Sequence, residues 1–471
     1  MTKGQIWITA GVAFYMVVML LIGWWASRKV KTTEDYIIAG RRLSWGLSIG
    51  TIFATWFGAE TCMGAADTAR TKGILGVIAD PFGAGLCLII AGIFLAPFFH
   101  KMNIKTVIDY FEKRHNKSTG LIMSIYYVPA YIGWIGAQML AFGTILSTLT
   151  SLPMNLSIFI SAAVVIIYTY SGGMLADAVT DFVQMGFILI CFAITLVCIV
   201  MKAGGIGNLT SDVPGEMFRL WPQQGTSTVG WLSYAQAWMV VGLGSLGGQD
   251  LISRLLSAKT QKVATWSAII SGLMYWTLGL IPVLLGIFAF KLLPDFKEGE
   301  SVLIQLSLIY LPLPLVALMV GGLLSAVMST IDTAMLAPAS ILGNNVMPHF
   351  KKDMGDKTKL FWCKMFVPIL GIFSLVLALY FKNIYELALQ SWTVLLTSFT
   401  APLLFSMFWK RTNAPGVLTG SLGGLVAWLI FSFSLPEEYP VAMFGLIVSV
   451  VLILFVTLLT QKRVEAAVTV R

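Results

Sequence analysis

Long apolar stretches separated by short polar segments make up most of the chain. A stretch of about 20 apolar residues is long enough to cross a bilayer as a helix. The pattern therefore predicts an all-α membrane protein with 13 transmembrane helices. The basic run Arg28-Lys29-Val30-Lys31 follows the first stretch and no small-residue cleavage pattern precedes it, so this stretch is interpreted as a retained span. The approximate limits of the thirteen stretches are 6–26, 44–69, 74–99, 119–148, 153–170, 174–201, 229–253, 263–290, 311–346, 361–381, 385–408, 414–434 and 440–461.

The composition agrees with a membrane protein. Hydrophobic residues make up 57% of the chain and charged residues only 11%, which excludes a soluble globular protein of 471 residues. The five cysteines show no CxxC spacing and the three histidines lie in polar segments, so neither a disulfide framework nor a metal centre is indicated. We find no nucleophile–histidine pair, metal-ligand cluster or Walker motif, and neither an enzyme nor an ATP-driven pump is predicted.

The net charge of +9 is unevenly distributed. If the N-terminus is outside, the inner segments hold 23 of the 31 Lys and Arg residues, which favours N-out and C-in by the positive-inside rule. The excess of Lys and Arg over Asp and Glu is then explained by orientation in a lipid bilayer, and no nucleic-acid partner is expected. The expected location is a bacterial-type inner (plasma) membrane. The inner segments in this orientation are 28–42, 100–117, 171–173, 254–262, 347–364, 409–413 and 462–471.

The spans can be grouped into two blocks of five. Because five is odd, the second block enters the membrane inverted relative to the first, as in many secondary transporters. We predict a first span and inner loop (1–43), a first repeat (44–203), an outer loop and second repeat (204–408), and two final spans with a short cytoplasmic tail (409–471). The polar connections leave no room for an appended soluble domain.

The first span of each block carries glycine and polar residues near its middle. The span 44–69 contains Gly58, Glu60 and Gly64, and the span 229–253 contains a glycine-rich run over 242–250. Unwound backbone at membrane depth is tolerated where protein or a watery cavity satisfies it, so we predict a helix break in both spans. Close helix packing is the alternative explanation for any single glycine.

The span 311–346 carries oxygen-bearing side chains on one face. At 100° per residue, Ser325, Ser329, Asp332 and Thr333 lie within one arc. A carboxylate inside the membrane is a functional-site hypothesis by default, and oxygen ligands suit hard cations such as Na⁺. The alternative is a hydroxyl-lined contact between helices.

Several motifs together resemble the sodium/solute symporter family, and the resemblance covers nearly the whole chain. Members that resemble this sequence include proline, galactose, sialic acid and choline symporters. The family has a LeuT-type fold of five plus five inverted helices, and Na⁺ is the coupling ion. The motifs are Ser171-Gly172-Gly173-Met174 with Thr180-Asp181-Phe182-Val183-Gln184, Gln249 with Arg254, and residues 324–330 (LSAVMST).

The resemblance implies a principal sodium site. In the family, two backbone carbonyls at the break in the first block bind the ion, and these positions are Ala54 and Phe57 here. A carbonyl and two hydroxyls come from the matching span of the second block, at Ala326, Ser329 and Thr330.

Three further residues are candidates for cation binding. Asp332 is not general to the family, but choline-type members have an Asp at the matching place, and an anionic ligand would strengthen sodium binding. The Asp matching Asp181 is linked in some members to a second sodium site or to sodium exit, and Thr333 faces the right way to help. The alternative is that Asp181 only caps or hydrogen-bonds near the inner end of its span.

Asp250 and Arg254 lie at i and i+4 and can pair with each other.

The candidate substrate-binding residues are Trp56, Glu60, Asp80 and Gln249. Asp80 matches a substrate-contacting Glu of galactose-type members, and Trp56 matches an aromatic position of choline-type members, where a cation–π contact holds a quaternary amine. The second aromatic that those members have near Gly248 is missing here. The alternatives to substrate binding are that Trp56 is an ordinary packing aromatic and that Glu60 is a helix-end or surface carboxylate.

The sequence thus predicts sodium-coupled symport of a small polar organic solute, such as an amino acid, an amine or a sugar-like compound, into the cell by alternating access. A proton-coupled symporter of the same fold is the nearest rival. A membrane sensor that binds solute without moving it is a second rival, although no signalling domain follows the last span.

Overall fold

A computed structural model of the chain describes residues 3–296, 300–351 and 353–469, and every element named within them is a helix. The helices of the first half are α1 (Lys3–Ser27), α2 (Thr33–Ile38), η1 (Ala39–Arg41), α3 (Trp45–Trp56), η2 (Glu60–Gly64), α4 (Ala65–Lys72), η3 (Ile74–Val77), η4 (Ile78–Gly83), α5 (Ala84–Ile90), η5 (Ala91–Leu95), α6 (Ala96–Phe99), α7 (Val107–Arg114), α8 (Lys117–Thr150), α9 (Met154–Ser171) and α10 (Met174–Lys202).

The second half continues the helical pattern. Its elements are α11 (Ile206–Thr210), η6 (Gly215–Phe218), α12 (Thr228–Gly242), η7 (Gly244–Gly247), α13 (Gln249–Ser257), α14 (Gln261–Leu278), α15 (Leu280–Leu292), α16 (Val302–Tyr310), α17 (Leu313–Ile341), η8 (Leu342–Val346), α18 (Met347–Phe350), α19 (Asp356–Tyr380), α20 (Ile384–Leu395), η9 (Leu396–Thr400), α21 (Ala401–Phe408), α22 (Ala414–Ser434) and α23 (Val441–Thr469).

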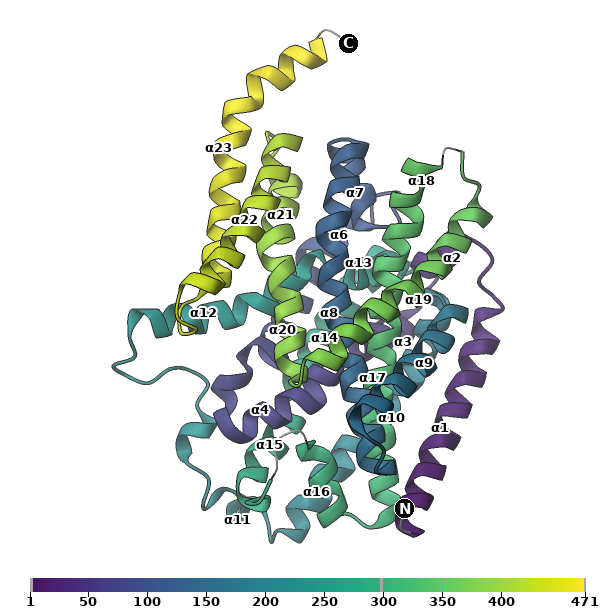
Figure 1. Cartoon of the computed structure of the whole chain (residues 1–471), viewed down its shortest axis with the longest axis vertical. Helices are drawn as coiled ribbons and strands as arrows, with labels where there is room; N and C mark the ends of the chain where they lie inside the picture. Colours follow the sequence, from purple (N-terminus) through teal and green to yellow (C-terminus); the bar gives the residue numbers. More distant parts are fainter. Residues whose placement is uncertain (1–2, 297–299, 352, 470–471) are drawn as a thin grey trace.

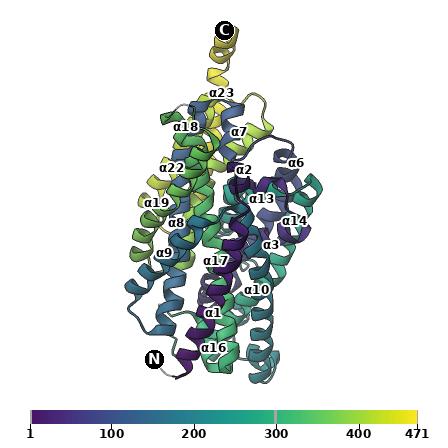
Figure 2. The same ribbon diagram turned by 90° about the vertical axis from the view of Figure 1, so that its right-hand side faces the viewer.

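Many of the longer helices run along the long axis of the molecule (Figures 1 and 2). α1 begins at the lower end of Figure 1 and α23 ends at the upper end. The helices α2, α7 and α18, from segments predicted to face the cytoplasm, lie in the upper half, whereas α11 and α16 lie at the bottom. This grouping agrees with the predicted sidedness, which stays a prediction.

Ten helical segments of the described chain are long and apolar enough to cross a membrane, and a shorter apolar helix covers Met154–Tyr170. The protein is therefore a multi-pass membrane protein. The two predicted spans outside this set, 44–69 and 229–253, are the ones in which we expected breaks. The total of 13 spans stays a prediction.

Both predicted breaks are confirmed. α3 ends at Trp56 and the chain resumes helical form from Ala59, while α12 ends at Gly242 and α13 begins at Gln249 after the short 3-10 turn η7. The carbonyl of Trp56, released from the helical pattern, accepts hydrogen bonds from the Tyr275 hydroxyl and from the Thr61 hydroxyl, at 3.2 Å in the second case. Side chains thus satisfy the unwound backbone, as burial requires.

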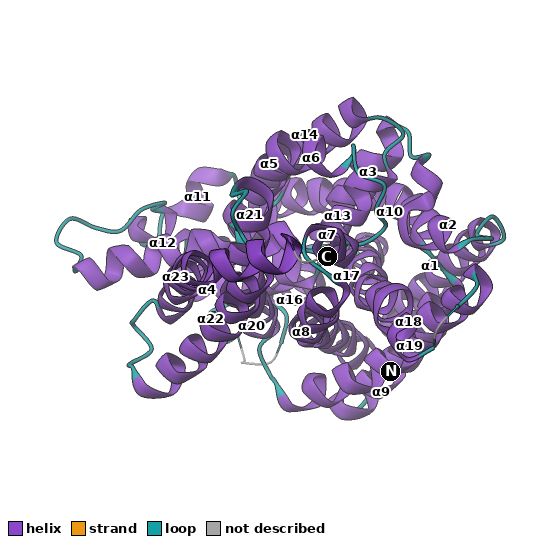
Figure 3. Ribbon diagram, turned by 90° about the horizontal axis from the view of Figure 1, so that it is seen from above, coloured by secondary structure: helices purple, strands orange, loops and turns teal. Residues whose placement is uncertain are grey.

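α17 lies at the centre of the helix bundle, which Figure 3 shows from above. It packs against α10, α8, α1 and α3, and its residues from Met319 to Ile341 are all buried. Small residues permit this close packing, because a Cβ at Gly322 would meet Cys191 at 2.8 Å. α1, α22 and α23 carry exposed large apolar side chains such as Trp24 and Phe433, as expected of surfaces that face lipid.

Candidate functional site

Oxygen atoms of α3 and α17 meet where α3 ends. The Ser329 hydroxyl donates to the carbonyl of Ala54 at 2.6 Å, and the Thr330 hydroxyl donates to the carbonyl of Thr55 at 2.8 Å. Both hydroxyls also contact the carbonyl of Ala326, at 3.3 and 3.0 Å respectively. We call these five residues the α3–α17 oxygen cluster. All five are buried.

The break in α3 explains why two carbonyls are free to face α17. In a continuous helix, the N–H groups of Gly58 and Ala59 would bond to the carbonyls of Ala54 and Thr55. Here Gly58 N–H donates to the Trp56 carbonyl at 2.9 Å, and Ala59 N–H donates to the side-chain oxygen of Gln138, also at 2.9 Å. The two released carbonyls are hard oxygen ligands of the kind that suit Na⁺.

Phe57 lies at the break itself. Its N–H makes the last helical bond of α3, to Phe53 at 2.9 Å, and its ring packs against Phe53, Phe192 and Tyr275. The next residue, Gly58, touches the cluster, because a Cβ there would lie 2.6 Å from the Thr330 hydroxyl. The role of the Phe57 carbonyl as a sodium ligand stays a prediction.

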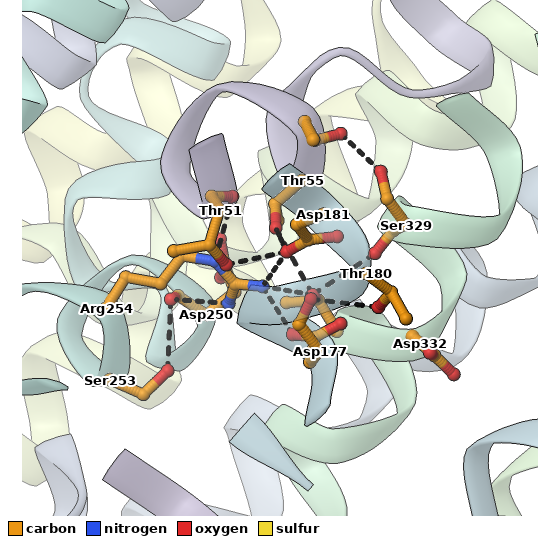
Figure 4. Close-up of polar contacts among 12 residues, drawn as sticks. Thr51, Thr55, Asp177, Thr180, Asp181, Asp250, Ser253, Arg254, Ser329 and Asp332 are labelled. Atoms are coloured by element: carbon orange, nitrogen blue, oxygen red, sulfur yellow. Dashed lines mark hydrogen bonds and ion pairs between the residues drawn. The ribbon is translucent and has the colours of Figure 1, made fainter. Parts of the chain in front are cut away.

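Asp332 faces a different neighbour. Its carboxylate accepts a hydrogen bond from the Thr169 hydroxyl of α9, and it lines a pocket with Tyr168 and Asp177. In Figure 4 Asp332 lies to one side of the drawn residues, and no dashed line joins it to Ser329. The structure therefore does not bring Asp332 to the oxygen cluster through any described hydrogen bond.

Arg254 is at the centre of a buried polar network, which we call the Arg254 network (Figure 4). Its Nη2 lies 2.6 Å from Asp177 Oδ2 and 3.3 Å from Asp181 Oδ2, and it also donates to the Thr333 hydroxyl. Thr333 donates to Asp177 at 3.0 Å, while the Thr51 hydroxyl donates to Asp181 at 2.6 Å. Four helices, α3, α10, α13 and α17, meet in this network.

Sequence reasoning misassigned the partner of Arg254. The contact of the guanidinium with Asp250 is to the backbone carbonyl, at 3.1 Å. The Asp250 carboxylate accepts from the Tyr131 hydroxyl instead. Asp177 was missed altogether. The available signal was its position one helical turn before Asp181, which places both carboxylates on one face of α10.

Glu60 is fully enclosed, with a relative exposure of 2%, so it is not a surface carboxylate. Its Oε1 accepts from the indole N–H of Trp134 at 2.7 Å, and its Oε2 accepts from the amide of Gln138 at 2.6 Å. Asp80 accepts a hydrogen bond at 2.8 Å from the hydroxyl of Thr61, the residue that follows Glu60.

Aromatic rings surround this region. Trp56 stacks on Trp392 of α20 with ring centroids 6.2 Å apart, and Trp134 of α8 lies 4.7 Å from Trp392. Tyr131 packs edge-on against Trp134 and Trp392. No sequence motif distinguished the aromatic residues that α8 and α20 contribute.

The side chain of Gln249 is bonded to the backbone at the start of α7. Its side-chain oxygen accepts from the N–H of Val107 at 2.8 Å, and its amide donates to the carbonyl of Lys105 at 3.1 Å. The described contacts of the Gln249 side chain thus fasten the start of α7. Its role in substrate binding stays a prediction.

Comparisons with known proteins point to one family. The profile of the sodium:solute symporter family matches residues 36–424. The high-affinity choline transporter 1 of Caenorhabditis elegans is 26% identical over 457 residues, covering 89% of this chain and 77% of that protein. The high-affinity proline transporter PutP of Bacillus subtilis (strain 168) is 28% identical over 469 residues, covering 95% of this chain and 97% of that protein.

The fold has a close structural counterpart. A solved structure of a Na⁺-coupled sialic acid symporter, in a substrate-bound outward-open state, matches with a TM-score of 0.80 at 20% identity, covering 96% of this chain and 98% of that chain. That symporter has a LeuT-like fold, which agrees with the predicted fold class. This chain therefore belongs to the sodium:solute symporter family and is a sodium-coupled secondary transporter rather than an enzyme.

Proposed function

We propose that the protein carries a small polar organic solute into the cell together with Na⁺, by alternating access across a bacterial-type plasma membrane. The observation that supports this most strongly is the oxygen cluster. Two carbonyls released by the break in α3 face two hydroxyls of α17, and all of these residues are buried. Sodium at this place would join α3 to α17.

The proposed binding site for Na⁺ takes Ala54, Ala326, Ser329 and Thr330 from the oxygen cluster, together with the carbonyl of Phe57 at the break. Binding there would hold the end of α3 in place, and α3 leads directly into the region of Trp56 and Glu60 where we place the solute. Coupling of this kind is reciprocal, so that each ligand raises the affinity for the other by the same factor. A membrane potential of about 100 mV, negative inside, adds about 2.3 kcal/mol per Na⁺ to the driving force.

Asp181 and Thr333 are proposed to form a second sodium site or part of the exit path. Asp181 Oδ2 is already bonded to Thr51 and Arg254, but its Oδ1 is buried without a hydrogen-bond partner among the described residues. A cation leaving the oxygen cluster has a carboxylate to meet here. Asp332 stays a candidate anionic ligand that would act from the α9 side of α17.

Trp56, Glu60 and Asp80 are the proposed solute contacts, because they are buried on both sides of the break in α3. Ligands of LeuT-type transporters bind near mid-membrane at discontinuous helices. Gln249 would act on the solute only indirectly, through the contacts it makes at the start of α7.

Uptake into proteoliposomes tests the proposal. A thermal-shift screen of amines, amino acids and sugars, with NaCl or KCl, first identifies a solute that stabilises the purified protein. Uptake of that solute is then measured under an inward Na⁺ gradient at constant pH, and under an inward pH step without Na⁺. We expect accumulation only under the Na⁺ gradient. Accumulation driven by the pH step alone would favour the proton-coupled rival, and binding without accumulation would favour the sensor.

A further inference from the structure

The hydrogen bonds of Glu60 indicate its charge state. Ala59 N–H donates to the side-chain oxygen of Gln138 at 2.9 Å, and this fixes the orientation of the Gln138 amide, so that its NH₂ group faces Glu60 at 2.6 Å. Trp134 can only donate, and its N–H is 2.7 Å from the other Glu60 oxygen. Both carboxyl oxygens therefore accept from fixed donors, which is the arrangement that suits an ionised carboxylate.

Among the described residues, no Lys, Arg or His forms an ion pair with this carboxylate. A charge buried inside a membrane bundle is normally paired, because an unpaired one is costly. The ion pairs of the described residues involve other carboxylates, and none of these ion pairs reaches Glu60, Asp80 or Asp250. The paired carboxylates are Glu34, Asp35, Asp356, Asp177, Asp181 and Asp212.

The surrounding rings are suited to a positive charge. Trp56, Trp134 and Trp392 are buried close to one another, and indole faces attract cations more strongly than other aromatic faces do. The indole N–H of Trp56 is buried without a hydrogen-bond partner among the described residues, so it is available for an acceptor oxygen of a ligand. Glu60 and these three rings come from helices α8, α20 and the two sides of the break in α3.

We propose that the transported solute carries a positively charged ammonium group, which is held by the Glu60 carboxylate and by the indole faces of Trp56, Trp134 and Trp392. This inference rests on the proposed function, since it assigns the solute class for the same transport site. It excludes neutral sugars. Na⁺ is assigned to the neighbouring oxygen cluster, and Gly58 lies between the two, because a Cβ there would meet both the Thr330 hydroxyl and Glu60 Oε2.

Matched ligands test the charge requirement. The thermal shift of the purified full-length protein is measured in NaCl with choline, ethanolamine and L-proline, and with two neutral compounds, D-galactose and 3,3-dimethylbutan-1-ol, in which carbon replaces the nitrogen of choline. We expect stabilisation by at least one ammonium compound and by neither neutral compound. Stabilisation by a neutral compound, or none by any ammonium compound, would overturn the proposal.

Substitutions then test Glu60 itself. We expect Glu60→Gln to weaken binding of the responding ammonium compound at least tenfold and to leave the stabilisation by NaCl over KCl, measured without solute, unchanged. The same exchange at an exposed position of α20, Glu386→Gln, is the control and should change neither. Undiminished ammonium binding in Glu60→Gln would overturn the proposal.

A double variant guards against a simple folding defect. Glu60→Gln combined with Gln138→Glu exchanges the two side chains, keeps the net charge and leaves an acceptor for Ala59 N–H, so part of the lost affinity should return. If the affinity does not return in a double variant that still responds to NaCl, the charge-pairing role is contradicted.

If Glu60→Gln abolishes the NaCl response instead, Glu60 belongs to the ion and the proposal fails. If the unsubstituted protein shows no NaCl response, sodium coupling itself fails.

Discussion

Ser329 and Thr330 each contribute one hydroxyl to the oxygen cluster, and both hydroxyls face α3. Replacing either by Ala removes one oxygen from the proposed sodium site. Hydrogen bonds to charged groups contribute about 1.5–3 kcal/mol, so we expect Ser329→Ala and Thr330→Ala each to raise the Na⁺ concentration for half-maximal uptake about tenfold or more. Ser325→Ala is the control, because the Ser325 hydroxyl bonds to Tyr15 of α1 instead. Unchanged sodium dependence in both cluster variants would contradict the site.

Asp332 provides a comparison on the same helix. Its carboxylate is bonded to Thr169 rather than to the cluster. We therefore expect Asp332→Asn to raise the half-saturating Na⁺ concentration less than Ser329→Ala does. Titration of uptake against Na⁺ in both variants checks this order. A larger effect in Asp332→Asn would assign the carboxylate to the ion directly.

His115, between α7 and α8, makes stability depend on pH. Burial and the neighbouring Arg114 lower its pKa from 6.5 to about 4, and its Nε2 lies 2.9 Å from the Ser406 hydroxyl. The unfolded chain therefore binds a proton between pH 6.5 and 4 that the folded protein does not, and His115 makes stability fall as the pH is lowered through this window. We expect His115→Gln to reduce the fall in Tm between pH 7 and pH 5. Identical pH profiles in the two proteins would contradict this.

The break between α3 and α4 is the structural element on which the cluster depends. A Cβ at Gly58 would lie 2.6 Å from the Thr330 hydroxyl and 2.9 Å from Glu60 Oε2. Gly58→Ala should therefore push α3 away from α17 and reduce sodium-dependent uptake severalfold or more. Gly186→Ala on α10 is the matched control, because nothing lies within 4 Å of its Cβ position. Equal uptake by the two variants would show that the close approach is unnecessary.

Elements were predictable where local composition determined them. Glycine and polar residues in the middle of an apolar span indicated both breaks, whereas the i, i+4 spacing of Asp250 and Arg254 suggested a pair that the structure does not form. What the sequence did not determine is how each helix is rotated against its neighbours. Asp332 shares an arc of α17 with Ser329, yet it bonds to α9 while Ser329 bonds to α3.

Contacts between distant segments were the least predictable part of the site. Arg254 pairs with Asp177, 77 residues away, and Glu60 is bonded to Trp134 and Gln138 across 74 and 78 residues. Such pairs depend on the packing of the whole bundle, and one sequence carries no periodic signal for them. The residues proposed for the principal sodium site could be named from the sequence only because they lie in a recognisable motif.

At the scale of the whole molecule, the Arg254 network joins four helices of the two predicted repeats. Removing the guanidinium would leave Asp177 and Asp181 buried without their cation, at a cost of about 3–5 kcal/mol. We expect Arg254→Ala to lower the Tm of the purified protein clearly, and Arg254→Ala with Asp177→Asn to recover part of the loss. A double variant no more stable than Arg254→Ala would show that charge pairing is not the reason.

Equilibrium binding of radiolabelled Na⁺ to the purified protein, without solute, tests the central claim most directly. We compare three proteins at equal concentrations: the unsubstituted protein, the Ser325→Ala control and the double variant Ser329→Ala/Thr330→Ala. Thermal unfolding confirms that each is folded. We predict that the double variant loses saturable binding at the principal site, whereas the other two proteins keep it. Equal binding by all three would contradict a sodium site between α3 and α17.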